Sequence, residues 1–317
     1  MIALVALGVL GTALVSTAAP LLTYSLTLAV FGLAHVLYEL RYVTRRFGPE
    51  LSARLRWGLV ALLAGVVLVR VGRLRGWWDG PAPTRAELGL VLAMAGLVLP
   101  PLWRAGRAPF GIGLALWVAG GLGLLISPVL TLFTLAMAHN WTPVGFLMDA
   151  LRGEARRRAL GACALVLGVV PLVIATGLPL RGLAALGWYL PDETVLPTGP
   201  MSSHFGAFLA PEWRQQPWTV PVFQAMVYAQ CMHYAAVIHV LPRLAPDRVG
   251  WPAFFSADEG RFFRVSLGLG ALLFAGFATS FATAKGIYSL PAGVHAWVEV
   301  PLLMLAVGAS GHRQAAG

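Results

Sequence analysis

The sequence predicts an all-α fold, a polytopic transmembrane helical bundle of about ten spans within a range of eight to ten. Three observations predict it. The 317 residues are 58% hydrophobic and only 11% charged, whereas about a quarter of the residues of soluble domains are charged. The mean hydropathy is +0.75. Several apolar runs approach or reach the ~20 residues that a helix needs to cross a ~30 Å hydrocarbon core.

The apolar runs and the prolines that interrupt them divide the chain into elements. Pro20 separates the first two spans and Pro128 divides the long run 109–150, because proline breaks a helix. The sequence predicts one integral membrane domain, 1–317. Within it, the segment 178–216, rich in Pro, Gly and Ser, is expected to form an outer loop or lid. The expected spans are 2–18, 20–40, 57–74, 87–102, 109–126, 128–150, 159–177, 217–241, 265–284 and 287–310.

The cationic residues predict the orientation of these spans. The net charge of +10 comes from 23 Lys and Arg residues, most of which lie in short loops, and this placement argues against a nucleic-acid partner. If both termini are cytoplasmic, sixteen of the 23 lie on the inner side, as the positive-inside rule requires. We therefore expect a multi-pass protein of a bacterial inner (cytoplasmic) membrane, with membrane lipids around it.

Four of the expected spans carry ionisable groups, which are costly inside a bilayer and normally face a bundle interior with a partner. Two of these spans contain a His-x-x-x-Glu pair, His35 with Glu39 and His295 with Glu299. Residues four apart lie one turn apart on the same helix face. Each pair can therefore bind one metal ion, or the carboxylate can orient the imidazole ring.

The other two spans contribute lone histidines at a similar depth, His139 and His233. Because histidines from four helices would meet in one layer of the bundle, the sequence predicts a metal site there. His239 follows His233 by six residues, which places it about 120° away around the helix axis. We therefore expect His239 to support the site or to act as an additional ligand. The predicted ligands are His35, His139, His233 and His295, and the predicted orienting groups or additional ligands are Glu39, Glu299 and His239.

Simpler interpretations remain open at this point. Each histidine can be a hydrogen-bonding residue of the packed interior. Glu39 can be an interfacial anchor paired with Arg41 or Arg45, and Asp149 fits a pairing with Arg152 at the inner surface.

Imidazole and carboxylate ligands suit Fe²⁺, with Zn²⁺ as the alternative. Cys231 points away from His233, which disfavours a thiolate ligand. An iron centre with an open position predicts an oxygenase that acts on a long apolar substrate with O₂, together with an electron-donor protein if the reaction needs one. A membrane zinc hydrolase, a transporter coupled to protons or metal ions, and a structural subunit are the alternatives.

The histidine patches resemble those of the membrane β-carotene dioxygenase (Brp/Blh) family in kind and in order along the chain. The matching pieces are "AHVLYEL", the region of His139, "YAQCMH" and "VHAWVEV". The family's GLPHG signature is GLAHV here, and its acidic residues are Glu instead of Asp. The resemblance implies iron- and oxygen-dependent cleavage of a polyene in the bilayer. The expected substrate is a long apolar chain such as a carotenoid, isoprenoid or acyl chain. It also implies that Tyr38 and Tyr228 line the pocket, and we expect Asn140, next to His139, to do the same.

Overall fold

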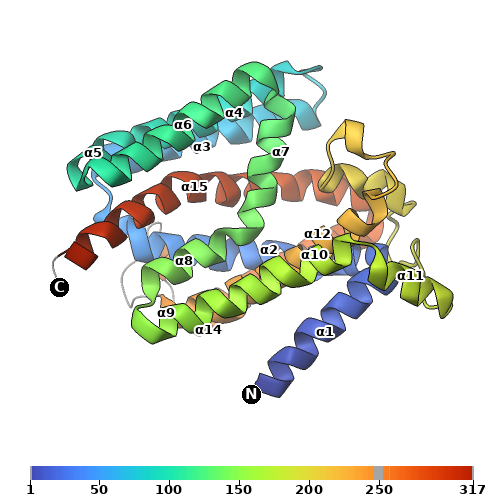
Figure 1. The fold of residues 1–317 in the computed structure, drawn as a ribbon. Helices are drawn as coiled ribbons and strands as arrows, with labels where there is room; N and C mark the ends of the chain where they lie inside the picture. Colours follow the sequence, from blue (N-terminus) through green and yellow to red (C-terminus); the bar gives the residue numbers. More distant parts are fainter. Residues whose placement is uncertain (1, 246–252, 257, 316–317) are drawn as a thin grey trace. The chain divides into compact units, whose positions relative to one another are not determined.

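The structure, a computed structural model, describes residues 2–245, 253–256 and 258–315. Within these residues every regular element is a helix and no strand occurs, which confirms the predicted all-α class (Figure 1). Residue contacts divide the chain into two compact units. Unit 1 comprises 1–35, 152–240 and 266–285, and unit 2 comprises 36–151, 241–265 and 286–317.

Three long helices, α2 (Pro20–Phe47), α14 (Glu259–Thr279) and α15 (Phe281–Ala315), contribute residues to both units. The other α-helices of unit 2 are α3 (Ala53–Leu74), α4 (Ala82–Leu97), α5 (Leu99–Ala105), α6 (Arg107–Ile126), α7 (Pro128–Ala138), α8 (Thr142–Ala150) and α13 (Leu241–Leu244). Those of unit 1 are α1 (Ile2–Ala18), α9 (Gly153–Cys163), α10 (Val170–Ala175), α11 (Leu178–Ala185) and α12 (Thr219–Ala235).

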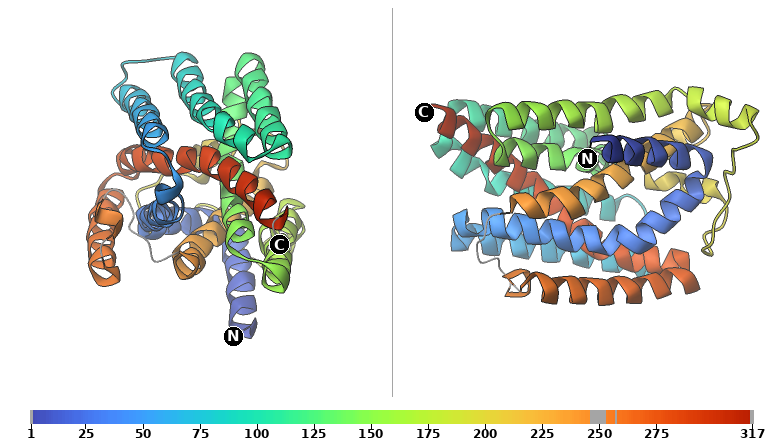
Figure 2. Two further views of the ribbon diagram at one scale, coloured as in Figure 1. Left: turned by 90° about the vertical axis from the view of Figure 1, so that its left-hand side faces the viewer. Right: turned by 90° about the horizontal axis from the view of Figure 1, so that it is seen from below.

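In unit 2, α4 packs between α3 and α6, and α7 contacts both α4 and α6. Figure 2, left, shows α3, α4 and α6 nearly end-on as neighbouring helices. Side chains of α3 and α4, together with Trp297, form a core that includes Leu59, Val66 and Met94. Because Trp297 belongs to α15, this core also fixes the part of α15 that lies in unit 2.

A buried polar network reinforces this attachment of α15. The Glu87 carboxylate of α4 accepts hydrogen bonds from Trp297 Nε1 at 2.7 Å and from Arg70 Nε at 2.9 Å. Arg70, on α3, also donates to the carbonyl of Ser289. Two residues of α15 are therefore held on either side of His295, which sets the position of that helix along its axis.

An aromatic cluster packs in the interior of unit 1. The Tyr24 ring lies 5.8 Å from that of Phe223 and 5.4 Å from that of His204. Segment 178–216 contains α11 and short 3₁₀ turns, and its Phe205 and Leu209 are buried. Met201 N donates to Asp192 Oδ1 at 2.7 Å. The segment is therefore a packed part of unit 1, while its role as a lid stays a prediction.

Seven helical segments in the described chain are long and apolar enough to cross a membrane, compared with the ten spans expected from the sequence. They begin at Pro20, Ala53, Ala82, Arg107, Gly153, Glu259 and Phe281. Residues 3–18 form a shorter apolar helix. Expected span 128–150 is interrupted after Ala138, and expected span 217–241 changes to a π-helix at Ala236–Val240. These long apolar helices indicate a multi-pass membrane protein.

The network around Glu87 gives a test of the fold. We expect Glu87→Ala to lower the free energy of unfolding by about 3–5 kcal/mol, because it leaves the Arg70 charge without its buried partner. Glu154, whose exposed side chain pairs with Arg158 at 2.9 Å, is the control, and its replacement by alanine should cost at most about 1 kcal/mol. Reversible unfolding in mixed micelles measures both. Equal losses for the two variants would show that Glu87 does not hold α15.

Candidate metal centre

His139 lies at a break in the helical backbone of unit 2. The α7 helix ends at Ala138, and residues His139–Trp141 form a 3₁₀ turn before α8 begins. Pro143 explains the break: it has no N–H for the carbonyl of His139, and its ring would clash with that carbonyl in a continuous helix. The Thr142 hydroxyl donates to the His139 carbonyl at 2.9 Å instead. Non-helical backbone at membrane depth is tolerated where protein surrounds it or where it lines a cavity.

The ring of His139 is oriented by a carboxylate from α15. Its Nδ1 lies 2.8 Å from Glu299 Oε2, and the Glu299 side chain is fully buried. Because a carboxylate accepts, Nδ1 carries the hydrogen and the lone pair lies on Nε2. The arrangement is the one in which a carboxylate fixes the tautomer of a metal-binding histidine.

Backbone carbonyls assign the same tautomer to His35 and His295. The Nδ1 of His35 lies 3.4 Å from the Phe31 carbonyl, and the Nδ1 of His295 lies 3.4 Å from the Pro291 carbonyl, each four residues earlier on the same helix. Since a carbonyl only accepts, each Nδ1 is the donor, and each Nε2 is left as a base.

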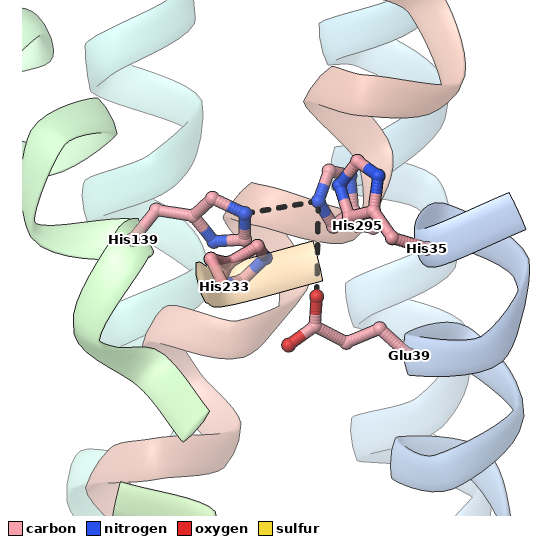
Figure 3. A group of neighbouring side chains, drawn as sticks. All are labelled: His35, Glu39, His139, His233 and His295. Atoms are coloured by element: carbon pink, nitrogen blue, oxygen red, sulfur yellow. Dashed lines mark hydrogen bonds and ion pairs between the residues drawn. The ribbon is translucent and has the colours of Figure 1, made fainter. Parts of the chain in front are cut away.

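The Nε2 atoms of His139 and His295 face each other at 3.0 Å (Figure 3). With the tautomers just assigned, two lone pairs point at one another, which is repulsive unless a proton or a metal ion lies with them. Two nitrogens bound at ~2.1 Å are ~3.0 Å apart at right angles about the metal and ~3.4 Å apart in a tetrahedron. The observed distance therefore fits two ligands of one ion.

Glu39 supplies an oxygen to the same place. Its Oε2 lies 3.9 Å from His295 Nε2, and the side chain is fully buried. Glu39 lies one turn after His35 on the uninterrupted helix α2, so the local geometry of that helix places both side chains on one face. In unit 2 alone, Glu39, His139 and His295 therefore bring together two imidazoles and a carboxylate.

His35 and His233 belong to unit 1. Their rings meet edge to face with centroids 5.4 Å apart, and the Tyr234 ring stacks on His35 at 3.9 Å. His233 lies three residues before the π-helix Ala236–Val240, and π-bulges inside α-helices are frequent at functional sites. Tyr234 holds the plane of the His35 ring in a fixed orientation.

One ligand atom from each of His35, Glu39, His139, His233 and His295 lies within 4.8 Å of the others (Figure 3). A coordination sphere with ~2.1 Å bonds has a diameter of ~4.2 Å, so small side-chain shifts would complete it. The residues present therefore fit a metal ion: four imidazoles and one carboxylate, four of the five residues buried. This buried cluster can hold a metal, and its donor set suits iron, zinc or manganese.

The structure places the other predicted site residues elsewhere or in supporting positions. Glu299 acts through His139, as described above. His239 lines a separate cavity in unit 1. Asn140 donates to the Met137 carbonyl at 3.3 Å and so closes the end of α7. The Tyr38 ring packs on Phe262, and Tyr228 is buried in a core cluster of unit 1.

The structure shows contacts of the charged residues that the simpler interpretations name. Arg41 pairs with Glu259 at 2.9 Å, and Arg45 Nε donates to the Phe255 carbonyl. Asp149 pairs with Arg46 at 2.7 Å. The helix α2 places Glu39 on the face that it shares with His35.

Sequence reasoning missed Glu87, which lies at the start of an expected span and was not counted among the intramembrane acids. It also missed the interruption at His139. Pro143 was the available signal for that interruption, because a proline four residues after a histidine removes the helical partner of the histidine carbonyl.

No protein-family model, curated protein or solved structure matches this chain. Inferences about function therefore rest on the geometry of the site.

The Glu299–His139 bond gives a test of the metal centre. We expect Glu299→Gln to weaken metal affinity about 10–100-fold, because the orienting carboxylate charge is lost while the shape is kept. Competition with a chelator on purified protein measures this affinity. Glu50→Gln, which changes a half-exposed partner of Arg46, should leave it unchanged. Equal affinities for wild type and Glu299→Gln would contradict a role of Glu299 in metal binding.

Proposed function

We propose that the chain is an integral membrane, iron-dependent oxygenase that oxidises or cleaves a long apolar substrate, such as a carotenoid, isoprenoid or acyl chain. The observation that carries the proposal is the buried cluster of four imidazoles and one carboxylate. Five protein donors leave one position of a six-coordinate ion for a reactant. Carboxylate and imidazole ligands with an open position are typical of non-haem iron sites that use O₂.

Iron in this site would supply the activation of O₂. In a dioxygenase cleavage, one carbon–carbon double bond and one O₂ molecule give two carbonyl groups, so atoms and electrons balance without another reductant. A hydroxylation would instead consume two electrons from a donor protein. The resemblance to the β-carotene dioxygenases favours the first reaction.

The chain's own residues would hold and shield this chemistry. Glu299 keeps the Nε2 lone pair of His139 directed at the cluster, and the carbonyls of Phe31 and Pro291 do the same for His35 and His295. The surrounding side chains are apolar, so water is kept away from a reactive intermediate. A lipid-soluble substrate reaches such a site from the bilayer of the bacterial inner membrane.

The first test is elemental analysis of the detergent-purified protein. We expect about one iron per chain, and loss of most of it in His139→Ala and His295→Ala. His204→Ala is the matched control. His204 is also buried, but its ring packs on Tyr24 and Phe281, and its Nε2 donates to the Thr198 carbonyl at 3.0 Å. Burial and the nearby Lys285 charge lower the pKa of His204, so it is neutral near pH 7.

Oxygen uptake with a polyene substrate is the second test, with chromatography of the products. Iron together with iron-dependent uptake supports the oxygenase. Bound zinc with ester or amide hydrolysis supports the zinc hydrolase. Release of bound metal on the far side of a vesicle supports a transporter, and protein without metal overturns all three.

A further inference from the structure

Unit 2 contains a cavity of about 590 Å³ between α4, α6, α7 and α15, with His139 on its wall. Pockets that bind small molecules have volumes of about 300–1,000 Å³. The lining residues of α6 extend from Pro109 to Gly120, which is ~16 Å at 1.5 Å per residue. Those of α7 extend from Leu130 to Ala138, ~12 Å on the same scale. The cavity is therefore long and reaches the metal centre.

The polar side chains on this wall donate their hydrogen bonds to backbone carbonyls of the protein. The hydroxyls of Thr131, Thr134 and Thr142 donate to backbone carbonyls three or four residues earlier, each at 2.9 Å. Trp117 Nε1 donates to the Leu92 carbonyl at 3.0 Å. Among the lining residues that the structure describes, His139 is the single ionisable one. A ligand in this cavity would find apolar walls and one imidazole.

Two glycines of α6 lie on the wall of the cavity. Gly113 and Gly120 are seven residues apart, so they lie on the same face of α6, ~10 Å from each other. A Cβ at Gly113 would lie 2.6 Å from Leu102 Cδ1, and a Cβ at Gly120 would lie 2.6 Å from Leu92 Cδ2. Both contacts are with the ends of flexible side chains. A larger residue at either position would have to displace these leucine ends. Because Gly113, Gly120 and Leu92 all line the cavity, this displacement would narrow it.

We propose that this cavity binds one linear hydrocarbon arm of the substrate, with the reacting carbons beside His139. Gly113 and Gly120 determine how long an arm fits. The proposal rests on the proposed function, because His139 is taken as a ligand of the reactive metal. It adds two points. The substrate carries no polar group along this arm, and the bond that reacts is determined by the length of hydrocarbon chain between that bond and the end of the arm.

The test uses metal-free protein in phospholipid nanodiscs, so that binding is measured apart from reaction. The probe is a linear hydrocarbon with a terminal alkyl diazirine, in a series of chain lengths, and mass spectrometry locates the label after photolysis. We expect label within residues 109–120 and 130–142 of the wild type. Gly113→Leu and Gly120→Leu should lower this labelling at least tenfold for the longest probe and least for the shortest.

Gly111→Leu and Gly121→Leu are the matched controls on the same helix, because a Cβ at either position meets nothing within 4 Å. Both should label like the wild type. Thermal unfolding checks that all four variants are folded, and Gly113→Ala and Gly120→Ala, with a smaller expected loss of labelling, replace any leucine variant that is not.

Each other outcome separates this inference from the proposed function. Iron-dependent oxygen uptake without label in the cavity overturns the inference and leaves the oxygenase in place. Length-selective label in a protein that binds no iron supports the hydrocarbon site and overturns the oxygenase. Equal label from a phospholipid with the diazirine on its acyl chain shows that bilayer lipid fills the cavity, which overturns the inference.

Discussion

The placement of protons on three buried imidazoles is the constraint on which the site depends. His35, His139 and His295 each direct Nδ1 at an acceptor, a backbone carbonyl or the Glu299 carboxylate. Their Nε2 atoms are thereby left as bases in an apolar interior, beside Glu39. Burying so many bases together is costly unless something positive joins them. A metal ion can bind several of these bases at once, whereas a shared proton joins only two. The geometry therefore favours a metal centre over a packed polar core.

Helical periodicity made the main features predictable. The fold class follows from composition, and the two His-x-x-x-Glu pairs follow from the spacing of four residues, since a helix places such residues on one face whatever the rest of the chain does. His139 and His233 could be added because an isolated histidine in an apolar segment needs a partner. The structure brings all four histidines and Glu39 together, as that reasoning requires, while their role as ligands stays a prediction.

Contacts between residues distant in the chain could not be predicted in the same way. The bond from His139 to Glu299 spans 160 residues, and nothing in either segment specifies the other. Glu87 was missed because its partners, Arg70 and Trp297, lie on other helices. The break at His139 is different, because Pro143 is a local sequence signal for it. A count of apolar segments does not detect this break, because Pro143 lies near the end of an expected span.

The internally bonded hydroxyls of the unit 2 cavity affect the fate of a reaction product. Thr131, Thr134 and Thr142 have donated their hydrogens to the backbone, so a newly formed carbonyl oxygen would find no donor among them. An unsatisfied polar group in such surroundings costs about 1–3 kcal/mol. A cleaved or oxidised chain would therefore be retained about five- to 150-fold less well than its precursor. In the proposed oxygenase, this difference would limit product inhibition and favour release of the product into the bilayer.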